Sequence, residues 1–429
     1  MPGAPVAVIE VPGSKSVAIR ALCVAALARG RSTVDGAPAS DDIRAVVRSL
    51  RRLGVRIGGS PGGRLVIHGA GPGGMRGGEV RLDLGGSATG LRVLAAVAAL
   101  RPGETVLDGD ASLRRRPAGA IVESLRALGA RVSSAAGRPP LRVRGPLDAE
   151  AAARGIAVDA SGSSQAVSAL LLVGAALPGG IRLRLKGAVV SAPYVDLTVD
   201  AIAAAGGDAF RRGRRAGVRP RPLRRLAVRV EADWSSAAFP LVGAAILGRS
   251  VRVPGLRADS RQADRAILGI LGRAGARCGV DGRGAWCRGT GQPRAFRADL
   301  RDAPDLAPAA AALALFAPGT SRVCGAAHLR SKESDRIAAC VAAVRALGGR
   351  AEERADGFSV RGGTPRSGTV DPRGDHRVAL AFLVAAAAIP GARLADPRCV
   401  SKSWPGARAA LAPLLRAAAV SLPRRGRRG

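Results

Sequence analysis

The stretch LRALGARV at residues 125–132 recurs along the chain, and this recurrence decides the fold. Related phrases are LRRLGVRI (50–57), IAAAGGDAF (202–210), LGRAGARCGV (271–280) and VRALGGRAEE (344–353). Their shared glycines are Gly54, Gly129, Gly206, Gly275 and Gly348, spaced 69 to 77 residues apart. Regular recurrence of this kind marks a repeated supersecondary unit. The 429 residues hold six such units, the last of them degenerate around LLRAAAVSL at 414–422.

Each phrase ends an Ala/Leu-rich run with helical spacing, after which glycine stops the helix and an alternating strand begins. Each unit also contains a second helical run that starts at Ser or Thr, as in SVAIRALCVAALA (16–28) and SATGLRVLAAVAAL (87–100). Six units of this kind predict an α/β protein with two pseudo-equivalent domains of three units each. No GxGxxG phrase opens a helix after a strand, so we do not expect a Rossmann domain.

The composition is that of a globular protein, with 47% hydrophobic residues. No apolar run of membrane-spanning length is free of charge, Gly or Pro, and the Met1 end lacks a signal-peptide pattern. We therefore expect a soluble, cytoplasmic protein without a membrane partner. The six cysteines show no CxxC spacing, which favours free thiols over a disulfide framework or a metal site.

The formal net charge of +35 raises nucleic-acid binding as a separate hypothesis. Aromatic residues that could stack on bases make up only 2% of the chain, and the arginines are spread over its whole length. A coding bias toward Ala, Arg, Gly and Pro explains the excess better, so we expect no nucleic-acid partner. The densest basic run, Arg211–Arg225, is interpreted as a solvated loop between strands.

Lysine is rare in this chain, and its positions are informative. Only four of the 67 basic residues are lysine, and three of those, Lys15, Lys332 and Lys402, follow a serine. Lysine offers a compact charge and an amine whose pKa burial can lower enough for proton transfer. We therefore interpret these three lysines as functional positions where arginine fails.

Several other phrases place polar residues at the start of an apolar helix, where backbone N–H groups can bind an anion. They are DLGGSATGLR (83–92), SLRRRPAG (112–119), ASGSSQAVSALL (160–171), DAPDLAPAAA (302–311), HLRSKESDR (328–336) and GDHRVALAF (374–382). Ordinary helix capping is the alternative for Ser163, Ser164, Gln165 and Asp305. The phrase PGSKS (12–16) lacks the second glycine of a P-loop, which excludes that motif.

Taken together, these phrases resemble the enolpyruvyl transferase family over nearly the full length, from PGSKSVAIR to CVSKSWP. LRSKESDR, DHR and the final C-x-x-K-S-x-P are the most specific. The resemblance implies two domains, each of three βαβαββ-type units. It also implies two crossings between the domains, so that residues 1–12 join 232–429, residues 13–231 form the other domain, and the active site lies in the cleft between them.

Within the family, the chain resembles the branch that acts on shikimate 3-phosphate in chorismate and aromatic amino-acid biosynthesis. That reaction transfers the enolpyruvyl group of phosphoenolpyruvate to the 5-hydroxyl of shikimate 3-phosphate and releases phosphate. It runs by addition and elimination, in a monomer, with no metal and no organic cofactor. The alternatives are transfer to UDP-N-acetylglucosamine, as in the sister enzyme, or a member with shifted activity. The sister usually carries a reactive cysteine or acid on a loop that here reads DASLRRRPAG, without cysteine.

Motif matching implies a role for each site residue. Asp305 is implied to accept the 5-hydroxyl proton, while Glu333 and Lys15 move the methylene proton. The implied shikimate 3-phosphate site consists of Lys15, Ser16, Arg20, Ser163, Ser164, Gln165, Ser191, Asp305 and Lys332, with Tyr194 near the ring. The implied phosphoenolpyruvate site consists of Lys15, Ala88, Arg116, Gln165, Arg336, Arg377 and Lys402.

The chain departs from the family pattern at four positions. Ile19 replaces a residue that is more often polar, Gly86 replaces an Asn found in many members, and His328 replaces an Asn found in some. Ala88 stands where many members have Gly, and its methyl group should narrow the phosphoenolpyruvate pocket. We therefore hypothesise tolerance of glyphosate, an inhibitor that occupies this pocket.

Overall fold

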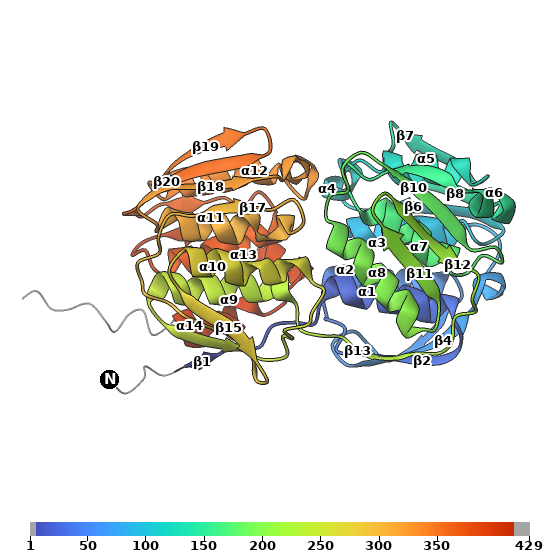
Figure 1. Ribbon diagram of the computed structural model, residues 1–429, viewed down its shortest axis with the longest axis horizontal. Coiled ribbons are helices and arrows are strands. Elements are labelled where there is room, and N and C mark those ends of the chain that lie inside the picture. Colours follow the sequence, from blue (N-terminus) through green and yellow to red (C-terminus); the bar gives the residue numbers. More distant parts are fainter. Residues whose placement is uncertain (1–5, 416–429) are drawn as a thin grey trace, which may run out of the picture.

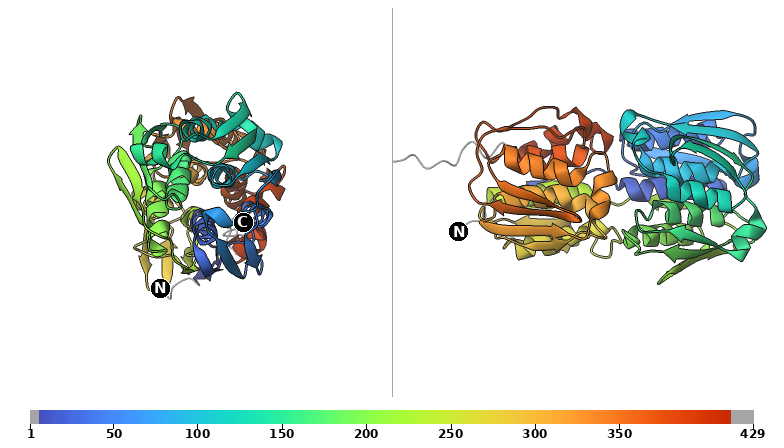
Figure 2. Two further views of the ribbon diagram at one scale, coloured as in Figure 1. Left: turned by 90° about the vertical axis from the view of Figure 1, so that its right-hand side faces the viewer. Right: turned by 90° about the horizontal axis from the view of Figure 1, so that it is seen from above.

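The computed structural model describes residues 6–415, which form two lobes of similar architecture (Figure 1). Lobe 1 runs from α1 (Lys15–Leu27) to β13 (Ala227–Arg229), drawn in blue to green. Lobe 2 consists of β1 (Ala7–Val8) and the chain from α9 (Trp234–Leu247) to α14 (Ala407–Leu415), drawn mainly in yellow to red. The two lobes lie side by side in both figures that show the whole chain (Figures 1 and 2).

Lobe 1 contains three units built on one βαβαββ plan. The first combines β13 and α1 with β2 (Arg29–Asp35), α2 (Asp41–Arg52), β3 (Arg56–Gly58) and β4 (Arg64–Ala70). The second has β5 (Val80–Asp83), α3 (Ala88–Ala98), β6 (Gly103–Asp108), α4 (Ala111–Arg114), α5 (Gly119–Ala127), β7 (Arg131–Ala135) and β8 (Arg138–Gly145). The third has α6 (Ala149–Arg154), β9 (Ile156–Asp159), α7 (Gln165–Gly174), β10 (Ile181–Lys186), α8 (Ala192–Ala204), β11 (Asp208–Arg212) and β12 (Arg215–Arg219).

Lobe 2 repeats the plan. Its first unit has β1, α9, β14 (Ser250–Val253), the 3-10 turn η2 (Ala263–Ala266), α10 (Ile267–Arg273), β15 (Arg277–Asp281) and β16 (Gly284–Arg288). The second has β17 (Arg297–Asp299), η3 (Pro304–Leu306), α11 (Ala307–Leu315), β18 (Gly319–Cys324), η4 (Ala327–Ser331), α12 (Arg336–Ala346), β19 (Arg350–Arg354) and β20 (Gly357–Gly362). The last has β21 (Thr369–Val370), α13 (His376–Ala386), β22 (Arg393–Leu394), η5 (Arg398–Lys402) and α14. Most of the phrase LLRAAAVSL lies outside the described residues.

The sheets show that the units are true repeats. Five four-stranded sheets share one strand order, in which the first two strands of the unit are parallel and the final hairpin adds antiparallel, as in β5-β6-β8-β7. The last unit shows the parallel pair β21-β22. The end-on view in Figure 2 shows sheets around the outside of the lobe and helices between them. The predicted α/β fold of repeated units is therefore confirmed.

The first strand of the chain belongs to lobe 2, and the chain therefore crosses between the lobes twice. β1, from the start of the chain, pairs with β14 in lobe 2, whereas β13, from the end of lobe 1, pairs with β2. The two crossings run side by side, with Ser14 N donating to Glu231 O at 2.8 Å and Asp233 N to Pro12 O at 2.9 Å. Two adjacent segments of the chain, at residues 12–14 and 231–233, therefore connect the lobes.

The repeated glycine has one structural role. Gly54, Gly129, Gly206, Gly275 and Gly348 follow α2, α5, α8, α10 and α12, and each has a positive φ between 79° and 95°. A side chain is disfavoured in this left-handed region, so glycine lets the chain leave the helix and enter the next strand. The sequence phrase thus predicted both the helix end and the strand that follows.

Each lobe has its own apolar core around three buried helices. One cluster of buried side chains is confined to lobe 1 and a second to lobe 2 and Ile9. α1, α3 and α7 occupy the first, and α9, α11 and α13 the second; these Ala/Leu/Val-rich helices are apolar on nearly all sides, which suits burial. Ile19 is fully buried in the first core and does not line a cavity between the lobes.

The interpretation of Arg211–Arg225 as one solvated loop is wrong for its first half. Residues 208–219 form the β11–β12 hairpin, whose arginines pair with carboxylates: Arg211 with Asp196 at 2.7 Å and Arg219 with Asp208 at 3.0 Å. β12 buries Ala216, Gly217 and Val218 and exposes the arginines at its two ends, Arg215 and Arg219. None of the helices in residues 6–415 combines the length and apolar character needed to cross a membrane.

Candidate active site

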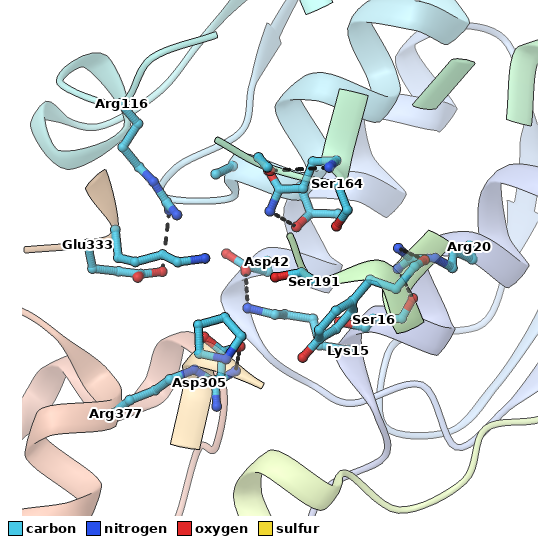
Figure 3. Close-up of a pocket in the computed structure, with 17 residues that line it drawn as sticks. Lys15, Ser16, Arg20, Asp42, Arg116, Ser164, Ser191, Asp305, Glu333 and Arg377 are labelled. Carbon is cyan, nitrogen blue, oxygen red and sulfur yellow. Dashed lines mark hydrogen bonds and ion pairs between the residues drawn. The ribbon is translucent and has the colours of Figure 1, made fainter. Parts of the chain in front are cut away.

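A polar cleft lies between the lobes (Figure 3). Most of the residues named from the sequence line it: Lys15, Ser16, Arg20, Ala88, Arg116, Ser163, Ser164, Gln165, Ser191, Tyr194, Asp305, Lys332, Glu333 and Arg377. Arg336 and Lys402 do not line it, but both contact Glu333 at its edge. The structure therefore brings together side chains that are more than 300 residues apart in the sequence.

The buried helices explain why the cleft is suited to anions. α1 begins at Lys15, α3 at Ala88 and α7 at Gln165, and all three of these residues line the cleft from lobe 1. From lobe 2, Asp305 lies in the turn before α11 and Arg377 in the first turn of α13. Helix N-termini carry free N–H groups and a partial positive charge, so the converging ends add to the potential of the side-chain cations.

Arg20 is a buried cation whose partners are neutral oxygens. Its guanidinium donates to Thr198 Oγ1 at 2.7 Å, Ser168 Oγ at 3.2 Å, and the carbonyls of Ser16 and Tyr194 at 2.8 Å each. Burial lowers its pKa to about 10. No carboxylate in residues 6–415 forms an ion pair with it. The surroundings of Arg20 are therefore suited to an anion, which would supply a counter-charge to the buried guanidinium.

Lys332 lines the cleft from lobe 2 and is also without an ion-pair partner among the described residues. Burial lowers the pKa of Lys332 to about 8, although nearby Asp305 opposes this shift. The amine is therefore only partly protonated above neutral pH. A second anionic group in the cleft would favour its charged form.

Two contacts close the lobes over the cleft near these cations. Tyr194 Oη donates to Asp264 Oδ2 at 2.7 Å, and Ser191 N donates to Arg301 O at 3.1 Å. Ser191 has a left-handed backbone with φ 54°, a conformation that costs a non-glycine residue about 1–3 kcal/mol. The strain is retained where α8 begins and where the cleft needs the Ser191 hydroxyl.

Glu333 is the centre of the opposite side. Its carboxylate contacts Arg336 Nη2 at 2.7 Å, Lys402 Nζ at 3.1 Å and Arg116 Nη1 at 3.3 Å. Burial opposes ionisation, but Lys402, Arg116 and Arg336 outweigh it and hold the pKa of Glu333 well below its ordinary value. Figure 3 shows Arg116 reaching from lobe 1 to Glu333 of lobe 2.

Asp305 is held in the same way. Arg377 Nη2 lies 2.8 Å from Oδ2 and Arg336 Nη1 lies 2.9 Å from Oδ1. Against the effect of burial, Arg377, Arg336 and Lys332 lower the pKa of Asp305 far below its ordinary value. Arg336 itself is locked by Asp375 at 2.9 Å, and Asp375 caps α13. Two catalytic-type carboxylates and three arginines thus form one ionic network.

Lys15 projects into the middle of the cleft. Its Nζ donates to Asp42 Oδ2 at 2.7 Å, and this contact fixes the amine between the two sides (Figure 3). A compact ammonium at this point reaches both sides, which agrees with the rarity of lysine at other positions.

A family model described as EPSP synthase (3-phosphoshikimate 1-carboxyvinyltransferase) matches residues 3–411. The chain belongs to the EPSP synthase family. Among curated relatives, the 3-phosphoshikimate 1-carboxyvinyltransferase of Methanopyrus kandleri is 38% identical over 92% of both chains. That of Bordetella petrii is 36% identical, again over 92% of both chains. A solved structure of EPSP synthase from Acinetobacter baumannii has a TM-score of 0.75 and 27% identity, over 96% of both chains. These findings confirm the family that the sequence motifs resemble.

Three residues that shape this EPSP synthase family cleft escaped the sequence analysis: Asp42, Thr89 and Arg92. Thr89 lines the cleft and accepts from Gln165 Nε2 at 3.0 Å. Arg92 donates to Gln165 Oε1 at 2.8 Å, to Ala88 O at 2.9 Å and to Pro117 O. Arg92 therefore connects α3 to the start of α7 and to the loop after α4, which carries Arg116. A charged residue inside the apolar run GLRVLAAVAAL was the available signal for Arg92, whereas Asp42 reads as an ordinary first-turn acid of α2.

The departures from the family pattern have local explanations. A Cβ at Gly86 would lie 2.9 Å from Lys402 Nζ and 3.0 Å from Asp110 Oδ2, so the missing side chain leaves space that the Lys402 amine uses. His328 in η4 has a buried Nε2 without a hydrogen-bond partner. Burial, reinforced by Lys332, lowers the His328 pKa to about 4. Ala88 is 4% exposed and lines the cleft.

Neither cysteine nor a metal-type cluster is part of the cleft. None of the six free cysteines lines it. Within residues 6–415, no group of three or more His, Cys, Asp or Glu side chains is arranged to hold a metal ion. The charged and hydroxyl side chains that line the cleft of this EPSP synthase family member are suited to ionic binding and proton transfer.

Proposed function

We propose that this chain transfers the enolpyruvyl group of phosphoenolpyruvate to the 5-hydroxyl of shikimate 3-phosphate, releasing phosphate. The observation that carries the proposal is the composition of one cleft. It holds two cationic clusters, around Arg20 and around Arg116, with Asp305 and Glu333 beside them. Two anionic substrates and two proton transfers require this set, and the family membership specifies the substrates.

Shikimate 3-phosphate binds on the Arg20 side. Its phosphate forms ion pairs with Arg20 and Lys332. It also accepts hydrogen bonds from the hydroxyls of Ser16, Ser163 and Ser164, at the N-termini of α1 and α7. Burial of Arg20 without a carboxylate partner supports this assignment, because a phosphate supplies the counter-charge and accepts several hydrogen bonds at once. Ser191, Gln165, Lys15 and Asp305 contact the rest of the molecule.

Phosphoenolpyruvate binds on the Glu333 side. Lys15, Arg116, Gln165 and Lys402 hold its phosphate, and Arg336 and Arg377 hold its carboxylate, with Ala88 forming the wall. The proximity of Arg336 and Arg377, both bound to Asp305 within 2.9 Å, supports a bidentate carboxylate site.

The proton transfers follow from these positions. Asp305 accepts the proton of the 5-hydroxyl while the hydroxyl oxygen forms a bond to C2 of phosphoenolpyruvate. Glu333 or Lys15 donates a proton to the methylene carbon. The tetrahedral adduct then loses a methyl proton, and its C–O bond to phosphate breaks. When the substrate carboxylate engages Arg336 and Arg377, Asp305 loses its counter-charges, so its pKa rises and it becomes a better base.

Residues 1–12 with 232–429 and residues 13–231 serve as two domains that close on the substrates. The separate cores and the paired crossings support this division. The protein works as a cytoplasmic monomer on small anions, with no nucleic-acid, membrane or cofactor partner. Small-angle scattering tests the closure: saturating both substrates compacts the protein, and an unchanged radius of gyration contradicts it.

The decisive experiment measures phosphate release from phosphoenolpyruvate with and without shikimate 3-phosphate. We expect release only with the shikimate substrate. Release that needs UDP-N-acetylglucosamine instead identifies the sister activity, and no release with either acceptor overturns the proposal.

A further inference from the structure

The Glu333 carboxylate is surrounded by cations from three separate elements. Arg116 comes from the loop after α4 in lobe 1, Arg336 from α12, and Lys402 from the end of η5. All three side chains lie within 3.3 Å of a Glu333 oxygen, and the Glu333 side chain is 9% exposed. One buried carboxylate thus serves three positive charges.

Two of these cations have no other partner in the described residues. Arg116 contacts only Glu333, and its buried Nε makes no hydrogen bond. Lys402 also contacts only Glu333. Arg336 is different, because Asp375 and Asp305 hold it as well. An incoming anion therefore finds Arg116 and Lys402 already engaged by a single carboxylate that it must displace, and an unsatisfied Nε–H on Arg116.

We propose that Glu333 is an internal counter-ion, which occupies Arg116 and Lys402 until a substrate phosphate displaces it. This inference rests on the proposed function in taking phosphoenolpyruvate as the natural phosphate donor. A phosphate dianion has more charge and more acceptor oxygens than a carboxylate, so it displaces Glu333 from Arg116 and Lys402. The displaced carboxylate keeps only Arg336 and lies beside His376, so its proton affinity rises when the substrate is in place.

Binding of inorganic phosphate to Glu333→Gln tests the competition without turnover. Gln keeps the size of the side chain but removes the charge that competes for Arg116 and Lys402. Charge-assisted hydrogen bonds of this kind correspond to about tenfold to a hundredfold in affinity, so calorimetry should show phosphate bound tighter by that factor. Phosphate bound at the Arg20 side, which Glu333 does not contact, keeps its wild-type affinity and is the internal reference.

Glu353→Gln is the matched control, because it adds the same net charge. Glu353 pairs with Arg330 at 2.9 Å on the exposed edge of β19, away from the cleft. We expect wild-type phosphate binding in this variant. Equal phosphate affinity in wild type and Glu333→Gln, or a weaker one in the variant, overturns the proposal. So does an equal gain in both variants, which signals net charge alone.

Proton uptake gives a second readout that a purely structural role does not move. Sulfate does not titrate near neutral pH, so calorimetry in buffers of different ionisation enthalpy reports protons taken up by the protein. Wild type should take up protons on Glu333 and Asp305 when it binds sulfate at mildly acidic pH, because sulfate takes over the cations of these carboxylates. Glu333→Gln should take up fewer protons, because only Asp305 remains to accept one. The charged groups facing Glu333 are Arg116, Arg336 and Lys402, and the titratable His376 lies beside them with a pKa that burial holds well below its ordinary value.

If Glu333→Gln does not fold, Glu333→Asp carries the test, because a shorter carboxylate cannot keep all three contacts. Tighter phosphate binding than in wild type then supports the proposal, and unchanged binding contradicts it. None of these measurements depends on shikimate-dependent phosphate release. Failure of this inference is therefore distinguishable from failure of the proposed function.

Discussion

The two sides of the cleft differ in how their cations are balanced. On the Arg20 side, the guanidinium is surrounded by hydroxyl and carbonyl oxygens and has no ion-pair partner in the described residues. On the Glu333 side, Arg116, Arg336, Arg377 and Lys402 are each paired with a carboxylate of the protein. The first side is an unneutralised anion site, and the second neutralises itself.

This difference separates binding from chemistry. An unpaired buried cation gains directly from an anion, so the Arg20 side is prepared for tight binding. On the paired side, Arg116, Arg336, Arg377 and Lys402 hold Asp305 and Glu333 ionised. In the proposed reaction, a substrate takes over these cations, so that the two carboxylates become more basic only when it is bound.

Lys15→Arg should have the largest effect, because Lys15 lies between the two sides. Arginine keeps the charge but loses the compact amine and its capacity for proton transfer. We expect kcat to fall about a hundredfold or more, the scale of general acid–base contributions. Steady-state kinetics measure this, and near-normal turnover would show that Lys15 only supplies charge. The midpoint of thermal unfolding should stay close to that of wild type.

Arg20→Lys tests the unpaired side alone. Lysine cannot reproduce the planar guanidinium, which donates hydrogen bonds to Thr198, Ser168 and two carbonyls. It also cannot bind a phosphate through two parallel N–H groups. The KM for shikimate 3-phosphate should rise about tenfold, the scale of one charge-assisted hydrogen bond, while the KM for phosphoenolpyruvate changes little. An equal rise in both constants would mean that the two sides are not separate.

The pH profile tests Lys332. Its lowered pKa of about 8 means that the charged form is present below pH 8 and is lost as the pH rises through that value. kcat/KM for shikimate 3-phosphate should therefore decline above pH 8 in wild type. In Lys332→Arg this decline should be absent, because arginine stays protonated. A decline of the same size in both proteins would assign it to another group.

Ala88→Gly tests the wall of the self-neutralised side, with the smallest change in structure. Removing one methyl group from a tight pocket changes inhibitor discrimination by about tenfold or more. Inhibition by glyphosate should therefore strengthen by that factor in the variant. Ala98→Gly, in the buried end of α3 and away from the cleft, is the control. Potent inhibition of the wild-type protein would refute the tolerance hypothesis.

Sequence reasoning reached most of the site because local patterns carried the signal. The serine–lysine pairs at Lys15, Lys332 and Lys402 stood out against an arginine-rich background, and polar residues at helix starts pointed to Gln165 and Asp305. The ion pairs that these residues form in the fold left no comparable pattern in the sequence. Asp42 lies in the first turn of the amphipathic helix α2, as many acids do, and only the fold brings its carboxylate within 2.7 Å of Lys15 Nζ.

The sequence by itself determined the repeated unit, because the helix-ending glycine and the helix and strand periodicities are local properties of the chain. It also indicated which residue types carry the chemistry. Only the tertiary structure decided that β1 joins lobe 2 whereas β13 completes the first sheet of lobe 1, that five helices direct their N-termini into one cleft, and that Glu333 neutralises cations from both lobes. Those outcomes depend on the packing of two separate cores and on Coulomb interactions between residues more than 200 positions apart, and no local pattern encodes them.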